Sequence, residues 1–308
     1  MEKKKALTSF LLGVATGFFI SKKAKASTKE FAKLHGPTKP LKFLHGYFYM
    51  RWPKAYVFIH RIGGKIHEII LLNSVDLAKR QLKSTYHGKI VKLSDAESLI
   101  KLNKEVSLVD LEQVIPYKHA RDIIIKNPDS IGVVDCPCRL SVKNPCLPSN
   151  VCLIVGEPYV SFVLEHNTKG ARRISKEEAL QILREEDERG HIHTAWFKSA
   201  MGDRFYAICN CCSCCCAGMK AFKDYGIPML ASSGYVAKID EENCLNCGLC
   251  LATCPFDAIE RGSGKPAVNY DKCMGCGLCV TKCGPGAISL SRDSSKGEPL
   301  SICELTKI

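Results

Sequence analysis

The sequence predicts an α+β protein with three parts: an N-terminal hydrophobic helix, a Cys-rich domain of α/β type, and a small C-terminal module built on a repeated cysteine motif. Three observations lead to this prediction. An uncharged apolar run lies near the N-terminus, helical and extended apolar patterns alternate in the middle, and two similar groups of four cysteines follow near the C-terminus. The length of 308 residues and the 46% of hydrophobic residues are typical of about two globular domains and exclude global disorder.

The positive charge is concentrated at one end of the chain. Of the formal net charge of +13, residues 1–65 carry +12, since they hold 12 lysines and 2 arginines against Glu2 and Glu30. A nucleic-acid-binding body would instead spread its lysines and arginines over a folded face. We therefore expect no nucleic acid among the partners.

The cysteine content indicates metal binding in a reducing compartment. The chain has 19 cysteines, an odd number, and several are adjacent, as in Cys211-Cys212 and Cys214-Cys215-Cys216. Neighbouring residues lie about 3.8 Å apart at Cα, which is below the usual disulfide separation of about 4.4–6.8 Å. A secreted disulfide framework is therefore a poor interpretation.

Residues 1–26 are predicted to form a short hydrophobic membrane anchor or signal-like segment. The apolar run Ala6–Ile20 is flanked by lysines and would reach about 22 Å as a helix, against a hydrocarbon core of about 30 Å. Lysines are more numerous after the run than before it, which by the positive-inside rule keeps the body of the protein on the cytoplasmic side of the cell membrane. A signal peptide cleaved near Ala24-Lys25-Ala26, and a loosely attached amphipathic tail on a soluble cytoplasmic protein, are the alternatives.

Residues 27–66 form a basic aromatic segment that we interpret as membrane-proximal. Aromatic rings prefer the headgroup level of a bilayer, and cationic side chains prefer anionic lipid. The alternative is that these rings cover part of the soluble core. The aromatic residues are Phe43, Tyr47, Phe48, Tyr49, Trp52, Tyr56 and Phe58, and the basic ones among them are Lys42, Arg51, Lys54 and Arg61.

Residues 67–234 are predicted to form a Cys-rich domain of mixed helices and strands. A helix begins after Ser175, which forms a capping box with Glu178, and it runs to about Arg189. Ala179, Ile182 and Leu183 form its buried face, and its charged residues are interpreted as a solvated face. Apolar spacing also predicts helices at Ile66–Leu82, Leu93–Lys104 and Pro116–Lys126, and strands at Ile131–Val134, Leu153–Val155 and Arg204–Ile208.

Ten cysteines of this domain lie in loops that follow predicted strands. They are Cys136, Cys138, Cys146, Cys152, Cys209, Cys211, Cys212, Cys214, Cys215 and Cys216. Soft thiolates select iron–sulfur clusters, zinc or Cu(I), so these thiols could hold one additional iron–sulfur cluster, or two. Overlapping Cys-x-x-Cys registers leave the ligands undetermined, and zinc or unmetallated redox and packing thiols are the alternatives. His191 and His193 would share one face of a strand and could join the site, although hydrogen-bonded histidines explain them as well.

The C-terminal module, residues 235–292, contains the most specific pattern. Cys244, Cys247, Cys250 and Cys254 are repeated 29 residues later as Cys273, Cys276, Cys279 and Cys283. Three thiolates at this spacing on a tight loop can wrap a cuboidal iron–sulfur cluster, and Gly248 and Gly277 let the backbone approach it closely. The last residues, 293–308, are predicted to be a polar tail.

The duplicated motif resembles that of bacterial-type two-cluster ferredoxins. The resemblance implies a ferredoxin-like module with two [4Fe–4S] clusters, in which the fourth cysteine of each run ligates the other cluster. Cluster I would then be held by Cys244, Cys247, Cys250 and Cys283, and cluster II by Cys273, Cys276, Cys279 and Cys254. In one departure from the family, Gly284 follows Cys283 where a proline is usual. Zinc at these eight positions is the alternative.

The middle domain resembles the cysteine-rich domains that precede ferredoxin modules in iron–sulfur proteins of anaerobic bacteria and archaea. The segments that carry this resemblance are Cys136–Arg139, Ile174–Ala179 and Cys209–Cys216. The resemblance covers about 100 residues and implies no specific biochemical role.

Together these features predict an iron–sulfur protein that relays single electrons through two [4Fe–4S] clusters at the cytoplasmic membrane. Its partners would be a redox protein as donor and another as acceptor, with the N-terminus on the membrane surface or on a membrane protein. One alternative is an oxidoreductase, or a subunit of one, whose Cys-rich domain carries a catalytic cluster. Another is a non-redox interaction protein stabilised by metals. A carrier is favoured over an enzyme because no nucleotide or hydrolase motif is present, and no catalytic residue is assigned.

Overall fold

The structure, a computed structural model, describes residues 24–70, 85–262 and 264–306. The apolar run Ala6–Ile20 and the second half of the helix predicted at Ile66–Leu82 lie outside the described residues. Among the helices that are described, none is both long and apolar enough to cross a membrane.

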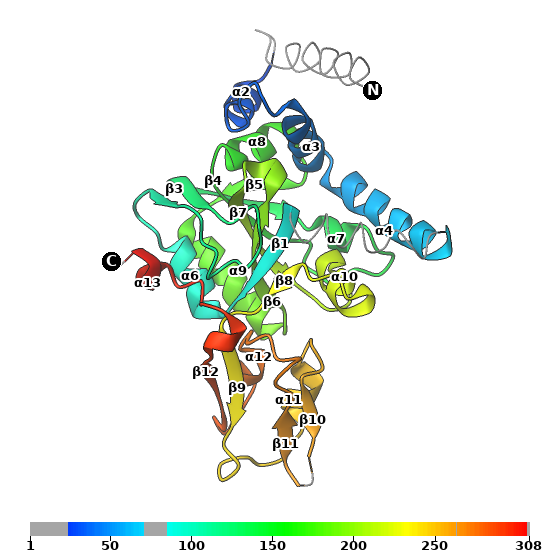
Figure 1. The fold of residues 1–308 in the computed structure, drawn as a ribbon, viewed down its shortest axis with the longest axis vertical. Coiled ribbons are helices and arrows are strands. Elements are labelled where there is room, and N and C mark those ends of the chain that lie inside the picture. Colours follow the sequence, from blue (N-terminus) through cyan, green and yellow to red (C-terminus); the bar gives the residue numbers. More distant parts are fainter. Residues whose placement is uncertain (1–23, 71–84, 263, 307–308) are drawn as a thin grey trace.

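The middle of the chain folds around one sheet of eight strands (Figure 1). Along the sheet the strands follow the order β2-β3-β4-β7-β6-β1-β8, and β5 pairs with β3. All pairs are antiparallel except β1 with β8. The prediction of mixed helices and strands is therefore confirmed. The strands are β1 (Tyr86–Val91), β2 (Val106–Leu108), β3 (Ile123–Asp135), β4 (Asn150–Glu157), β5 (Ala171–Ile174), β6 (Ile192–Lys198), β7 (Arg204–Cys211) and β8 (Leu230–Ala231).

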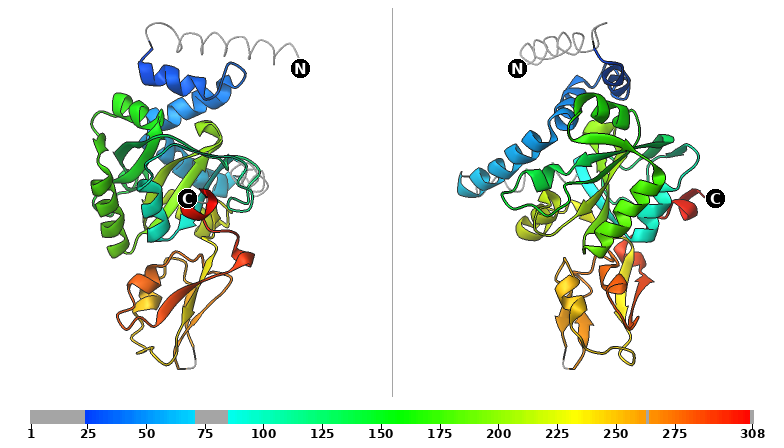
Figure 2. Two further views of the ribbon diagram at one scale, coloured as in Figure 1. Left: turned by 90° about the vertical axis from the view of Figure 1, so that its left-hand side faces the viewer. Right: turned by 180° about the vertical axis from the view of Figure 1, so that it is seen from behind.

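Each face of this sheet has its own hydrophobic core, because successive side chains of a strand point to opposite faces. Leu153 and Val155 of β4 pack on one face, which helices α6 (Leu93–Ile100), α9 (Lys176–Glu188) and α13 (Ile302–Thr306) cover. Cys152 and Ile154 pack on the other. That second face carries α2 (Ala26–Lys33), α3 (Pro40–Arg51), α4 (Pro53–Ile70), α7 (Pro137–Leu140), α8 (Tyr159–His166) and α10 (Ala217–Tyr225) (Figure 2).

The capped helix α9 begins where the sequence predicts. The Ser175 hydroxyl accepts a hydrogen bond from the Glu178 N–H at 3.2 Å, so Ser175 is the N-cap. The interpretation of the charged residues as a fully solvated face is wrong at the end of the helix, where Glu186 and Asp187 are buried. They are turned toward the sheet, where Asp187 lies 3.6 Å from Nε2 of His193 and Glu186 pairs with Arg139, as described below.

The helix predicted at Pro116–Lys126 is wrong, because β3 begins at Ile123. Ile123 and Ile125 are buried while Ile124 is not, which is the alternation of a strand, and β-branched side chains favour that conformation. Asn127 and Pro128 do not end the element. The pairing of β3 with β4 instead shifts register between Lys126 and Ile131, so the strand absorbs them as an irregularity.

The other predicted elements are largely confirmed, with different bounds. The helix predicted at Leu93–Lys104 is the shorter α6. The predicted strands Ile131–Val134, Leu153–Val155 and Arg204–Ile208 lie within β3, β4 and β7, each of which is longer. Cys152 consequently lies within β4, and Cys209 and Cys211 lie within β7, rather than in loops.

Several rings of the basic aromatic segment belong to the core rather than to an exposed belt. The Lys198 ammonium is surrounded by the rings of Tyr49, Tyr56 and Tyr86, with Nζ 4.5, 4.9 and 3.9 Å from the ring centroids. Burial lowers the pKa of Lys198 to about 7, whereas the three rings favour its charged form. Because Tyr49 and Tyr56 lie on α3 and α4, this contact ties both helices to the sheet. Phe48, Trp52 and Phe58 stay exposed at 37, 47 and 52%.

The C-terminal module is attached to one end of the sheet domain, and α2 and α3 lie at the opposite end (Figures 1 and 2). It repeats a small unit of strands and a short helix. The Met274 carbonyl accepts from the Ser233 N–H at 3.1 Å, and Lys282 donates to the Glu188 carbonyl at 2.6 Å; both hydrogen bonds help to fix the module to the sheet domain. The elements are β9 (Tyr235–Ile239) paired with β12 (Ile288–Arg292), β10 (Ile259–Arg261) paired with β11 (Pro266–Val268), α11 (Leu249–Thr253) and α12 (Leu278–Thr281).

The segment predicted as a polar tail is partly a core segment. Leu300 and Ile302 are buried at 1% and 2% exposure, and α13 packs on α6. The chain therefore returns from the C-terminal module to the sheet domain, and the two share one folded body.

Candidate metal centres

The eight cysteines of the C-terminal module line two separate cavities. One cavity is lined by Cys254, Cys273, Cys276 and Cys279. The other is lined by Cys244, Cys247, Cys250 and Cys283. Each cavity thus draws three cysteines from one repeat and the fourth from the other repeat. We call the first the inner cavity and the second the outer cavity.

Glycines allow the cysteine loops to fold tightly around these cavities. Gly248 and Gly277 stand at the starts of α11 and α12 with φ of 75° and 89°, a conformation that L side chains rarely adopt. A Cβ added to Gly275 would lie 2.2 Å from the Tyr235 carbonyl oxygen, so only glycine fits there. The departure at Gly284 leaves Cys283 in the wall of the outer cavity, together with Pro285.

The two cavities differ in their exposure to solvent. Cys247 of the outer cavity is exposed, whereas Cys273 and Cys279 of the inner cavity are buried. Burial and, to a smaller extent, the nearby thiols together raise the pKa of Cys279 to about 12. Such a thiol ionises at neutral pH only beside a metal cation, so metal binding would release its proton.

The rest of the inner cavity is apolar, since it is lined by Phe256, Ile259 and Leu290. The amide N–H of Ala258 donates to the Cys254 sulfur at 3.3 Å, a contact that stabilises thiolate charge.

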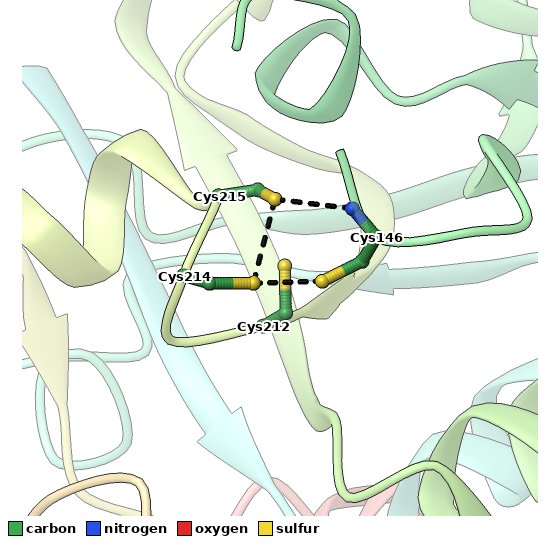
Figure 3. A group of neighbouring side chains, drawn as sticks. All are labelled: Cys146, Cys212, Cys214 and Cys215. Atoms are coloured by element: carbon green, nitrogen blue, oxygen red, sulfur yellow. Dashed lines mark hydrogen bonds between the residues drawn. The ribbon is translucent and has the colours of Figure 1, made fainter. Parts of the chain in front are cut away.

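Four cysteines of the middle domain converge at one place (Figure 3), where Cys214 is exposed and Cys212 and Cys215 are buried. The sulfur atoms of Cys146, Cys212, Cys214 and Cys215 all lie within 4.8 Å of one another. Cys146 comes from the loop between α7 and β4, and the other three come from the loop between β7 and α10. The Cys146 and Cys214 sulfurs are 2.7 Å apart, and the Cys214 and Cys215 sulfurs 3.4 Å. We call these four residues the tetrathiol site.

The remaining six cysteines of the middle domain form a second group on the same face of the sheet. Cys136, Cys152, Cys211 and Cys216 are buried, and Cys138 and Cys209 are partly buried. Each thiol interacts with two others, in the circular order Cys136, Cys152, Cys209, Cys211, Cys216, Cys138. The interactions with Cys152 and Cys211 lower the pKa of Cys209 to about 6. We call these residues the six-thiol group.

Strand alternation explains how the six-thiol group is assembled. Cys209 and Cys211 are two residues apart on β7, so both project from one face, and Cys152 projects from the same face of the neighbouring strand β4. Cys136 directly follows β3 and is the N-cap of α7, and Cys216 is the N-cap of α10. The sequence motif did not reveal this division into four and six thiols, but the period of two within β7 could have suggested which cysteines share a face.

A buried ion pair holds the thiol-bearing segments together. Arg139 of α7 and Glu186 of α9 have fully buried side chains, and Nη2 of Arg139 lies 2.5 Å from Oε2 of Glu186. Arg139 also donates to the Pro148 carbonyl and, at 3.3 Å, to the Asn210 carbonyl. Burial opposes ionisation of Glu186, but hydrogen bonds from His191 and Arg139 outweigh it and lower the pKa of Glu186 below its ordinary value.

The two histidines considered as ligands have other partners. Nδ1 of His191 lies 2.8 Å from Oε2 of Glu186, and Nδ1 of His193 lies 2.7 Å from Oδ1 of Asn210. Both residues are buried. The interpretation as hydrogen-bonded histidines therefore describes them, and we assign them no metal.

The inner cavity and the six-thiol group lie in one continuous hydrophobic core. Phe256 lines the inner cavity, and its ring packs edge-on against Phe222 of α10 at 6.2 Å. Lys223 of the same helix donates to the Pro255 carbonyl at 2.8 Å. From Phe222 back to Cys216, the helix spans six residues, or about 9 Å. Helix α10 is thus a short physical connection between the two groups of thiols.

This arrangement defines the class of the protein. The two cavities of the C-terminal module are lined by thiols and apolar side chains, and their glycine-containing loops fold tightly, so they are suited to iron–sulfur clusters. The additional cysteines of the middle domain are suited to binding further metal. Residues 237–290 match the family model described as a 4Fe–4S dicluster domain. No curated protein matches the chain. The prediction of an iron–sulfur domain at the C-terminus is therefore confirmed, and the chain is an iron–sulfur protein.

Proposed function

We propose that this protein relays single electrons between redox partners through two [4Fe–4S] clusters. Cys244, Cys247, Cys250 and Cys283 would hold one cluster, and Cys273, Cys276, Cys279 and Cys254 the other. The observation that carries the proposal is the pair of cavities, each lined by one of these crossed sets of four. A bound [4Fe–4S] cluster supplies one-electron redox chemistry. The chain contributes the thiolates, the apolar walls that keep water out, and the N–H donors that tune the sulfur charge.

The two cavities differ in exposure, which indicates a direction for electron transfer across the C-terminal module. The outer cavity opens at the surface next to exposed Cys247 and Leu245, where another redox protein can approach. The inner cavity faces the sheet domain and contacts α10 through Phe256. We infer that an external donor or acceptor protein docks at the outer cavity.

The six-thiol group supports a further redox centre inside the sheet domain. These six thiols, four of them buried and two partly buried, are connected to the inner cavity through α10 and are suited to an additional iron–sulfur cluster. This connection favours, as a second candidate, an oxidoreductase or subunit in which the C-terminal module supplies electrons to a centre held by the six-thiol group. We assign no catalytic residue there.

Attachment to the cytoplasmic side of the cell membrane is part of the proposal. The chain leaves the described structure at α2, on the end of the sheet domain opposite the C-terminal module (Figure 1). An anchor before α2 would therefore leave the outer cavity free for a partner. Deleting residues 2–20 keeps α2 whole and should move the protein from washed membranes to the soluble fraction with its iron content unchanged. Equal solubility of the intact chain would contradict the anchor.

The number of clusters is tested by counting iron and acid-labile sulfide in the full chain purified without oxygen. Two [4Fe–4S] clusters give about eight irons and eight sulfides per chain, and a third cluster in the six-thiol group raises both to about twelve. Zinc in place of iron in the C-terminal module would contradict the proposal. A count of about eight would confine the clusters to that module and remove the second candidate.

A further inference from the structure

We propose that Cys146, Cys212, Cys214 and Cys215 bind a single zinc ion, which forms a structural centre separate from every iron–sulfur cluster of the protein. This inference concerns the tetrathiol site alone and does not depend on the electron-transfer function. It divides the ten cysteines of the middle domain into two sites with different chemistry.

The spacing of the sulfur atoms favours one ion over a cluster. Four thiolates around one zinc, each at about 2.3 Å in a tetrahedron, lie about 3.8 Å from one another. All four sulfurs of the tetrathiol site lie within 4.8 Å of each other, so small side-chain adjustments reach this geometry. A cuboidal cluster places four metals between its thiolates and holds them farther apart. Within the residues that the structure describes, no other set of three or more metal-binding side chains is this close, the eight cysteines of the C-terminal module included.

The ligand set favours zinc among the metals that thiols select. Four thiolates in a tetrahedral arrangement are typical of zinc or of iron–sulfur sites, and zinc binds such ligands more tightly than ferrous iron does. With four protein ligands the coordination sphere is closed, which is the pattern of structural rather than catalytic zinc. Cys214 is exposed and Cys146 half-buried, so an ion can enter from solvent.

Contacts around the site stabilise the negative charge that four thiolates bring. The backbone N–H of Cys146 donates to the Cys215 sulfur at 3.4 Å. Such N–H donors orient thiolate ligands and delocalise their charge. Arg61 of α4 donates to the Cys215 carbonyl and so brings a guanidinium close to the site.

The position of the site indicates what the ion does. It would join the loop 141–149, which follows α7, to the loop 212–216, which precedes α10. These loops adjoin Cys138 and Cys216 of the six-thiol group. Closing them with one ion removes loop freedom from the native state and fixes both segments over that group. We therefore assign the ion a positioning role.

The test compares zinc content in the full chain and three variants purified without oxygen. Wild type should carry about one zinc per chain, and Cys303→Ser, which changes an exposed cysteine of α13, should match it. Cys146→Ser and Cys214→Ser change outer ligands and should weaken zinc binding by at least about tenfold. Their iron and sulfide contents should equal those of wild type. Cobalt introduced in place of zinc should give thiolate-to-cobalt absorption in wild type and Cys303→Ser only.

The outcomes separate this inference from the proposed function. Wild type without zinc, or variants that keep it, would overturn the zinc site. Loss of about four irons with their sulfide from Cys214→Ser would show a cluster there and would also overturn it. Absence of iron from the C-terminal module would contradict the electron-transfer proposal and leave the zinc count unaffected.

Discussion

Replacing Cys283 with alanine is expected to remove the metal cluster of the outer cavity and to leave the inner one in place. Cys283 lies in the second repeat, but it lines the cavity formed by Cys244, Cys247 and Cys250 of the first. A [4Fe–4S] cluster that loses a thiolate ligand should be lost, which lowers the iron content of the C-terminal module from about eight to about four per chain. Cys254→Ala should do the same to the inner cavity.

Two double variants decide whether the ligands cross between repeats. Cys244 and Cys283 line one cavity, so Cys244→Ala with Cys283→Ala should lose only about four irons. Cys244→Ala with Cys254→Ala touches both cavities and should lose about eight. If each repeat held its own cluster, these two results would be exchanged. Cys303→Ala provides the matched control, since this exposed cysteine lines neither cavity.

Glu186→Gln is expected to cause a large loss of folding stability. Glu186 neutralises Arg139, and both side chains are fully buried. Removing one partner leaves a guanidinium in the core without its counter-charge, which costs about 3–5 kcal/mol of unfolding free energy. Denaturant unfolding without oxygen measures the difference. Glu185→Gln is the control, because this neighbouring carboxylate is paired at the surface with Arg189 and its loss should cost less than about 1 kcal/mol.

The pH dependence of this difference follows from the depressed pKa of Glu186. A carboxyl whose folded pKa lies below its unfolded value contributes its full stabilisation above the unfolded pKa, near 4.3, and loses it as the pH falls through the folded pKa. The difference in unfolding free energy between wild type and Glu186→Gln should therefore be constant from about pH 8 to 5 and decrease only below about pH 4. A difference in unfolding free energy of less than about 1 kcal/mol between wild type and Glu186→Gln at pH 7 would contradict the assigned role of the ion pair.

The C-terminal module was predictable because its ligands are local in sequence. Cys273, Cys276 and Cys279 occupy one tight loop, so their spacing alone fixes which thiols share a site. Only the fourth cysteine of each cavity comes from a distant segment, and the resemblance to two-cluster ferredoxins predicts it. The glycine at position 277 is required by its φ of 89°, and it appears in the sequence at the same place in both repeats.

The middle domain was less predictable because its thiols are sorted by tertiary structure. Cys211 and Cys212 are adjacent, yet they belong to different groups, since one projects from the face of β7 and the other begins the following loop. Overlapping Cys-x-x-Cys pairs cannot reveal such a division. Glu186 was assigned to solvent for a similar reason, because its partner Arg139 is 47 residues away in sequence. The helix predicted at Pro116–Lys126 failed because alternation over Ile123–Ile125 is too short to distinguish a strand from a helix.

Reduction of the full chain, purified without oxygen and followed by EPR, tests the central claim most directly. That claim is that the crossed sets of four cysteines hold two clusters that each accept one electron. A strong reductant should bleach the brown absorption reversibly and produce about one unpaired spin per cluster in the C-terminal module, with magnetic interaction between the two. Cys283→Ala with Cys254→Ala should abolish both signals. A colourless protein, or a brown one whose absorption and EPR spectrum do not change on reduction, would contradict the account.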